Sequence, residues 1–250
     1  MTLAGLHVLN TRPAHQAQPL SAALQSAGAV VTELPLIGIA PRELSATDRR
    51  LLLELDRYDA VFFVSANAAR LGLDAVAGVW PQWPHRLPCF AVGESTASVL
   101  REAALDVHVP AQADSEGLLA MPELQELTGR KFLLCRGEGG RAWLLEGLRE
   151  RGAHVDVLEL YRRELPADAR RQWQVLHEGS DRQTDVVVLT SPDALRHWQQ
   201  VAGSDALRPL WLVVSSRMLA LARLAGARAL CAEGADVPSI VAALSSADIF

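Results

Sequence analysis

The residues of this 250-residue chain that could do chemistry lie in six short segments, each placed after an apolar run. These segments combine glycine, hydroxyl side chains and arginine, which suit the binding of carboxylates or phosphates. The richest is Arg136-Gly-Glu-Gly-Gly-Arg141, whose backbone amides and two guanidinium groups could wrap an anion; a turn with solvated arginines is the alternative. The segments are residues 11–15, 65–67, 93–96, 136–141, 191–193 and 215–217.

From these segments we predict a set of substrate-binding residues that share a place at the start of a helix or in the loop before it. The hydroxyls of residues 95–98 have a simpler alternative, since they could only cap a helix. The predicted set is Arg12, Ser65, Ala66, Asn67, Gly93, Ser95, Arg136, Gly137, Arg141, Ser191 and Ser216.

Several familiar catalytic motifs are missing from the sequence. It contains no phosphate-binding P-loop, no GxGxxG and no GxSxG, and its seven histidines do not group with serine or cysteine in a known pattern. Any catalysis would therefore depend on positioning and backbone electrostatics. Tyr161, one of two tyrosines, lies in an extended segment. Without a functional role, it would be a tyrosine packed in a strand.

Composition excludes several classes of protein. Half of the residues are hydrophobic and the net charge is -5, so a sizeable core is expected and no basic field recruits nucleic acid. No apolar run is long enough for a membrane span and no secretion signal is seen, which predicts a cytoplasmic protein. Cys89, Cys135 and Cys231 lie in or beside apolar runs, which favours buried core thiols over a disulfide framework or a metal site.

The chain repeats itself at an offset of 124 residues. Both copies read as strand, loop, helix, glycine stop and strand, with helices expected at about residues 16–27 and 140–151 that end at glycine. The eight identities are Arg12/Arg136, Leu20/Leu144, Leu24/Leu148, Gly28/Gly152, Ala29/Ala153, Val31/Val155, Leu34/Leu158 and Leu36/Leu160.

Further blocks match beyond this one, including residues 59–70 with 185–196 at an offset of 126. In each, an apolar strand ends in a serine that can cap the following helix, Ser65 in one copy and Ser191 in the other. Apolar strands that alternate with amphipathic helices predict an α/β fold of two similar doubly wound parallel-sheet domains. We expect a ligand to bind in a cleft between the two domains, where the strands end.

Residues 30–41 and 154–166 are extended patterns longer than a typical strand, and they occupy equivalent places in the two copies. If both cross between the domains, they form a two-stranded connector and the domains exchange segments. One domain would then be residues 1–37 with 167–250, and the other residues 38–166. The simpler alternative divides the chain near residues 125–130.

The chain resembles the uroporphyrinogen-III synthase family over essentially its whole length. The resemblance rests on the order and spacing of Thr11-Arg12-Pro13, Phe63-Val-Ser-Ala-Asn-Ala68, Phe90-Ala-Val-Gly-Glu-Ser-Thr-Ala97, Asp114-Ser-Glu-Gly-Leu118, the 136–141 segment, Gly152 and Tyr161. It implies two α/β domains joined by a two-stranded ladder. It also implies a cyclising lyase that takes hydroxymethylbilane, loses water and inverts ring D, with no metal and no organic cofactor.

The resemblance also implies roles for residues and partners. Tyr161 would be catalytic by assisting departure of the hydroxyl, and Thr96 would be catalytic by positioning the substrate. The ligand would be a linear tetrapyrrole bearing eight carboxylates, and the protein is expected to be a monomer with transient contact to hydroxymethylbilane synthase. The sequence departs from the family pattern at Ser215, where a glycine is usual, and serine lacks the freedom of glycine at positive φ, although a serine there can still cap the helix.

Two rival functions remain open at this point. A two-domain binding or sensor protein could close on an anionic ligand without chemistry and would share the same loops. The second rival is a nucleotide-dependent transferase, which is disfavoured because the sequence has no phosphate-binding loop.

Overall fold

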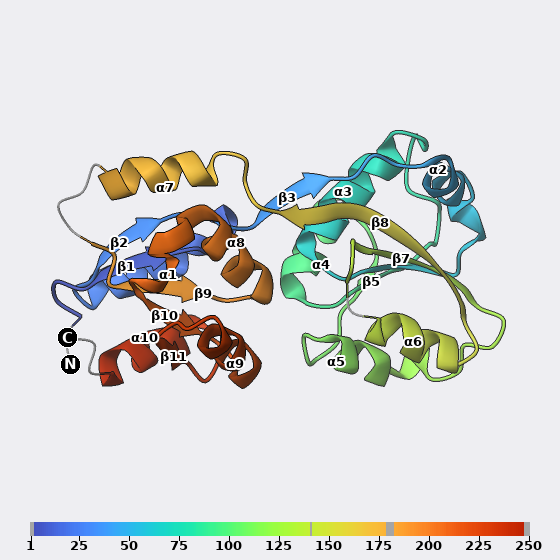
Figure 1. Cartoon of the computed structure of the whole chain (residues 1–250). Coiled ribbons are helices and arrows are strands. Elements are labelled where there is room, and N and C mark those ends of the chain that lie inside the picture. The colour runs from blue at the N-terminus through green and yellow to red at the C-terminus, as the bar shows by residue number, and fades with distance from the viewer. Residues whose placement is uncertain (1–2, 141, 179–182, 248–250) are drawn as a thin grey trace. The chain divides into compact units, whose positions relative to one another are not determined.

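The computed structural model describes residues 3–140, 142–178 and 183–247, and the chain forms two compact units (Figure 1). Unit 1 is made of Met1–Gly38 and Glu164–Phe250, and unit 2 is made of Ile39–Arg163. Each unit has its own sheet.

The sheet of unit 1 has five parallel strands in the order β11-β10-β9-β1-β2. In unit 2 the parallel order is β8-β7-β4-β5-β6, with β3 added beside β8. The strands of the first sheet are β1 (His7–Asn10), β2 (Val30–Glu33), β9 (Val186–Leu189), β10 (Leu210–Val213) and β11 (Ala229–Cys231). Those of the second are β3 (Gly38–Pro41), β4 (Ala60–Phe63), β5 (Cys89–Ala91), β6 (Val107–His108), β7 (Lys131–Gly137) and β8 (His154–Glu164).

The sequence repeat appears in the structure as two sheets whose parallel strands have the same order. β1 and β2 correspond to β7 and β8, and β9, β10 and β11 correspond to β4, β5 and β6, so the five parallel strands follow the same order in both sheets, and β3 is an additional edge strand of the second. The units differ in chain order, because the β1–β2 pair comes first in unit 1 and its counterpart comes last in unit 2. The two units are therefore circular permutations of one architecture.

Helices cover both faces of each sheet, because every strand sends alternate side chains to opposite sides. In unit 1, Leu9 and Val187 pack with α7, α8 and α9, whereas Val8 and Val188 pack with α1 and α10. The helices of unit 1 are α1 (Ala14–Ser26), α7 (Ala169–Glu178), α8 (Pro192–Ala202), α9 (Ser216–Leu224) and α10 (Val237–Ser246). None of the helices in the described part of the chain has the length and apolar character that a membrane span needs.

Unit 2 follows the same plan. Phe63 and Leu133 pack with α2, α3 and α4 on one face, and Phe62 and Leu134 pack with α5 and α6 on the other. Its helices are α2 (Ala46–Leu53), α3 (Ala66–Ala77), α4 (Glu94–Glu102), α5 (Ser115–Ala120) and α6 (Trp143–Glu150). Helices on both faces of two mainly parallel sheets confirm the predicted fold class.

The two long extended segments are the places where the chain passes between the units. The first is interrupted after Glu33, so that β2 belongs to one sheet and β3 to the other, while the second is the single long strand β8. β3 and β8 are neighbours in one sheet, and Figure 1 shows them alongside each other. The expected exchange of segments and the two-stranded connector are both present.

The local boundaries differ from the sequence expectation at the starts of two helices. α1 begins at Ala14 rather than residue 16, and α6 begins at Trp143 rather than residue 140. The latter shift has a physical reason, because Gly139 has φ of 66° and turns the chain before the helix can start. The predicted stops are correct, since Gly28 and Gly152 follow the last turns with φ of 97° and 88°.

All three cysteines are free thiols. Cys89 and Cys135 are buried as predicted, whereas Cys231 is only half-buried at the edge of its sheet. Burial, with a smaller effect from Asp106, raises the pKa of the Cys89 thiol to about 12, so this thiol is not poised as a nucleophile.

Candidate active site

The loops predicted to bind a ligand follow the carboxyl ends of the parallel strands. Each sheet has one topological switch point among these loops. The helical connections lead away in opposite directions from the adjacent strands β1 and β9 in unit 1, and from β7 and β4 in unit 2. Open α/β sheets bind ligands beyond the strand ends at such switch points. In unit 2 the loops at this point begin at Val64 and at Glu138.

Tyr161 lies at the switch point of unit 2, near the end of β8. Its side chain is buried, with 2 % of the residue exposed, and its hydroxyl lies 3.0 Å from Ser65 Oγ. Ser65 is the N-cap of α3, and its Oγ accepts the backbone N–H of Ala68 at 3.1 Å. The structure thus brings together the two side chains that sequence reasoning placed in separate motifs.

A β-bulge determines where the Tyr161 ring lies. Arg136 pairs with Glu159, but the next residue of β7, Gly137, pairs with Tyr161, which leaves Leu160 as the extra residue of β8. The ring then packs on Gly137 so closely that a Cβ atom there would lie 2.6 Å from ring atoms Cε2 and Cζ. Gly137, predicted as a substrate-binding residue, packs against the ring of Tyr161.

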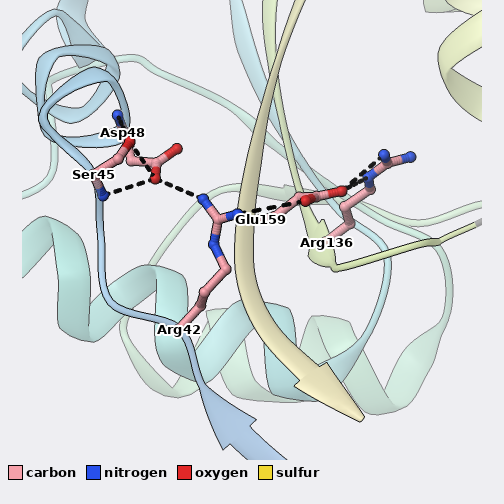
Figure 2. Close-up of polar contacts among 5 residues, drawn as sticks. All are labelled: Arg42, Ser45, Asp48, Arg136 and Glu159. Atoms are coloured by element: carbon pink, nitrogen blue, oxygen red, sulfur yellow. Dashed lines mark hydrogen bonds and ion pairs between the residues drawn. The ribbon is translucent and has the colours of Figure 1, made fainter.

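Arg136 is held by a chain of charges that continues to α2 (Figure 2). Its Nη2 and Nε donate to Glu159 Oε1 at 2.9 and 3.2 Å, and Arg42 Nη1 lies 3.6 Å from Glu159 Oε2. Arg42 Nη2 in turn donates to Asp48 Oδ2 at 2.7 Å. Two arginines therefore face two carboxylates, and the charge of Arg136 is balanced within the protein.

Asp48 ends this chain and also closes the first turn of α2. Its Oδ2 accepts from the backbone N–H and the hydroxyl of Ser45, at 2.9 and 2.8 Å, and its own N–H donates back to Ser45 Oγ. Burial alone would raise the pKa of the Asp48 carboxyl, but the hydrogen bonds from Ser45 and Arg42 together hold it below its usual value.

Replacing Asp48 with Asn is expected to lower the free energy of unfolding by about 1–2 kcal/mol near neutral pH, because charged hydrogen bonds to Arg42 and Ser45 are lost. A carboxyl whose pKa is lowered on folding stabilises the protein above its unfolded pKa, and this contribution is lost as the pH falls through the folded value. Urea unfolding of the wild type and Asp48→Asn should show a difference that shrinks as the pH falls through the lowered pKa of the Asp48 carboxyl. A difference that does not depend on pH would contradict this account.

The other predicted residues of unit 2 lie around α3 and α4. Ala66 and Asn67 are half-buried in the first turn of α3. Gly93 is the N-cap of α4, and no side chain caps that helix, so the capping alternative for the nearby hydroxyls is wrong. Ser95 is exposed, whereas Thr96 is buried, with 3 % of the residue exposed.

In unit 1, two of the predicted residues already form hydrogen bonds within the protein. Arg12 donates a hydrogen bond to the carbonyl of Ala235, and burial lowers the pKa of its guanidinium although nearby Asp236 opposes this. Ser191 is the N-cap of α8, as predicted, and accepts from Ala194 N–H at 3.1 Å. Ser216 is exposed at the start of α9. Arg141 lies outside the described residues.

The departure from the family at Ser215 needs no special backbone. Ser215 has φ of -163°, which is extended and open to any residue, and its side chain accepts from Met218 N–H at 3.3 Å. The alternative that a serine at this position still caps the helix is therefore confirmed.

Sequence reasoning missed Arg42, Asp48 and Glu159. The only signal for Glu159 was its place two residues before Tyr161, and nothing in the sequence linked it to Arg42. Within residues 3–140, 142–178 and 183–247, no cluster of three or more His, Cys, Asp or Glu side chains could hold a metal ion.

Comparison with known proteins identifies the relatives of the chain. A model of the family described as "Uroporphyrinogen-III synthase HemD" matches residues 18–242. The chain is 33% identical to the uroporphyrinogen-III synthase of Salmonella typhimurium and 30% identical to that of Escherichia coli, in each case over 96% of this chain and 100% of the relative.

Solved structures agree in fold. The uroporphyrinogen-III synthetase of Helicobacter pylori superposes with a TM-score of 0.62 at 13% identity, covering 95% of this chain and 97% of the other. A mutant uroporphyrinogen III synthase of Thermus thermophilus gives a TM-score of 0.56 at 18% identity, covering 96% and 98%.

Proposed function

The chain belongs to the uroporphyrinogen-III synthase family, and on that premise we propose that it cyclises hydroxymethylbilane to uroporphyrinogen III. The observation that carries this proposal is the match to the Salmonella typhimurium synthase at 33% identity over the full length of that relative. The pairing of Tyr161 with Ser65 at a switch point of unit 2 supports it, because it places a phenol where sheets of this kind bind ligands.

The proposed reaction is that of a hydro-lyase. The terminal hydroxyl of hydroxymethylbilane leaves as water, and the resulting azafulvene is attacked by the substituted carbon of ring D to form a spiro intermediate. The bond from that carbon to the methylene between rings C and D then breaks, and the methylene closes on the free carbon of ring D. One water is lost and every other atom is retained, so no redox partner is required.

Tyr161 is the group we assign to the first step, in which its phenol donates a proton or a hydrogen bond to the departing hydroxyl. Its burial keeps competing water from that phenol, and the bond to Ser65 fixes where it lies. Thr96, buried in the first turn of α4, is proposed to position the substrate. The remaining task of the enzyme is to hold the bilane folded so that direct closure is avoided.

The eight carboxylates of the substrate need hydrogen-bond donors. Helix N-termini can supply them, and these differ in whether a side chain caps them. α3, α8 and α9 are capped by serine side chains, whereas α1, α4 and α6 have no side-chain cap. Uncapped N-termini keep their N–H groups for an anion. We assign substrate carboxylates to these three ends, with Arg12 close in sequence to the start of α1.

Replacing Gly93 with Ser should raise KM for hydroxymethylbilane about twofold to tenfold, because a serine would cap α4 as Ser215 caps α9 and compete with a carboxylate. The backbone at Gly93 is extended, with φ of -167°, so serine can adopt it. A new Cβ would meet Ala113 Cβ at 3.2 Å, and Gly93→Ala has the same contact without the hydroxyl. The difference in KM between the two variants measures the cap; equal values would remove α4 from substrate binding.

The proposed function is tested by incubating the protein with freshly prepared hydroxymethylbilane and separating the uroporphyrinogen isomers. Isomer III in excess of the enzyme-free blank is expected. Isomer I alone, at the rate of the blank, would favour the rival reading of an anion-binding protein without catalysis.

The substrate closes spontaneously, so the time between its release and its capture matters. We propose that the protein acts as a monomer in the cytoplasm and meets hydroxymethylbilane synthase only transiently. Sedimentation of the protein alone and mixed with that enzyme would reveal a stable dimer or complex, either of which would contradict this.

A further inference from the structure

The hydroxyl of Ser65 has two neighbours, and together they indicate which way its proton points. Resting on the proposed function, we propose that Ser65 and Gly137 are positioning residues for Tyr161, and that neither binds substrate. Both were grouped with the substrate-binding residues by sequence alone. The structure instead places each in direct contact with the phenol of Tyr161.

The direction of the hydrogen bond follows from the cap. Ser65 Oγ accepts the N–H of Ala68 at 3.1 Å, at the N-terminal end of α3 where only donors converge. The hydroxyl proton of Ser65 must therefore point elsewhere, and within the described residues its other hydrogen-bond partner is Tyr161, 3.0 Å away. We assign Ser65 as the donor and the phenol oxygen as the acceptor.

This assignment leaves the proton of Tyr161 free to serve the substrate. A phenol oxygen that accepts a hydrogen bond becomes a better donor through its own O–H, because hydrogen bonds in a chain polarise one another. Ala68 N–H, Ser65 and Tyr161 form such a chain, which starts at the N-terminus of α3 and ends at the proposed site of hydroxyl departure.

Gly137 provides the room that the ring needs. A Cβ there would lie 2.6 Å from two ring atoms and 3.0 Å from the phenol oxygen, distances at which the ring must move. The other copy of the repeat supplies an internal comparison, because there Pro13 stands in place of Gly137 and Ile37 in place of Tyr161. The glycine is thus found in the copy that carries the tyrosine, next to the bulge that turns the tyrosine inward.

A double-mutant cycle of Ser65→Ala and Tyr161→Phe tests the role of Ser65. We expect Ser65→Ala to lower kcat about three- to tenfold with little change in KM, and to have no further effect once Tyr161 is Phe. Ser65→Thr keeps a hydroxyl and a cap and should restore most of kcat. Ser215→Ala removes a comparable N-cap in the other unit and controls for the loss of thermal stability.

Gly137 is tested by replacement with Ala, against Gly78→Ala as the control in the same unit. A Cβ at Gly78 would meet its nearest atom at an ordinary 3.4 Å, and φ there is -71°. Gly137→Ala should lower kcat about tenfold or more with a smaller effect on KM, while Gly78→Ala should not change either value.

A measurement without turnover separates this inference from the proposed function. The chain has two tyrosines, so ¹³C at tyrosine Cζ gives two NMR signals, and Tyr58→Phe assigns them. Ser65→Ala and Gly137→Ala should each shift the Tyr161 signal and leave that of Tyr58 unchanged. Failure of the proposed function appears instead as isomer I alone from the wild type.

Two results would overturn the inference even if isomer III is formed. The first is additive effects on kcat in the cycle, or a rise in KM as the main effect of Ser65→Ala, since either would mean that Ser65 contacts substrate directly. The second is a Tyr161 signal that does not respond to Ser65→Ala.

Discussion

Tyr161→Phe lowers kcat by about two to four orders of magnitude, the range that general acid catalysis supplies, while the fold is retained. The reason is that the phenol is the group proposed to protonate the departing hydroxyl, and the spontaneous reaction that remains yields isomer I. Phe fits the same space on Gly137, so the loss is confined to the hydroxyl and its bond to Ser65. The measurement is kcat for isomer III, with thermal unfolding of the same sample.

Tyr58→Phe is the matched control. Tyr58 is the other tyrosine of unit 2, is also buried, and also has a bonded hydroxyl, which donates to Asp156 Oδ2 at 2.8 Å. Burial and the bond to Asp156 raise the pKa of Tyr58, so it stays protonated. We expect this variant to lose about 1 kcal/mol of stability and to keep its kcat. Near-normal turnover by Tyr161→Phe would remove Tyr161 from the mechanism.

Glu159→Gln lowers the free energy of unfolding by about 2–3 kcal/mol, because it removes the carboxylate that separates two guanidinium groups. Arg136 and Glu159 are largely buried, with 15% and 22% of their side chains exposed, so water replaces little of the lost interaction. The Nε of Arg42 is already buried without a hydrogen-bond partner. Arg42 is left with Asp48 alone, and Arg136 with the carbonyl of Gly140.

The control for this prediction is Glu54→Gln, which breaks ion pairs on the surface. Arg50 and Arg57, the partners of Glu54, are 79% and 68% exposed, and such pairs contribute about 0–1 kcal/mol. Denaturant unfolding of both variants gives the comparison. Equal losses in the two variants would show that Glu159 is no more than another surface carboxylate.

The sequence was sufficient to predict the architecture because the two copies of the repeat can be compared with each other within one chain. Eight identities at one offset predicted that residues 12–36 and 136–160 have the same local fold, and the equal order of the parallel strands in the two sheets confirms it. The extended pattern of residues 30–41 was too long for one strand, and the structure divides it between two sheets. The first conclusion needed the aligned identities, and the second needed the length of the extended pattern.

The position of Tyr161 could not be read from the same pattern. Leu158 and Leu160 alternate as one face of a strand, so Tyr161 would be expected on the opposite face. The bulge at Leu160 shifts the register by one residue and buries Leu160 and Tyr161 together. A one-residue irregularity has no compositional signal, although Gly137 opposite the ring is consistent with it once the pairing is known.

The state of Arg136 was equally hidden, since its partners come from distant parts of the chain. The sequence presented it as an arginine in a glycine-rich loop, ready for an anion, whereas Glu159 and Gly140 already occupy its guanidinium. The absence of a side-chain cap on α1, α4 and α6 likewise depends on cap geometry, which the sequence suggests only through the serines at the other helices.

The central claim is that this chain inverts ring D, and the bond that breaks can be followed directly. Hydroxymethylbilane would carry ¹³C at the methylene between rings C and D and at the ring D carbon bonded to it, and the product would be examined by NMR. The account predicts that the one-bond coupling between the two labels disappears as enzyme is added, because that bond is exchanged for a new one. Retention of the coupling in all of the product would contradict it.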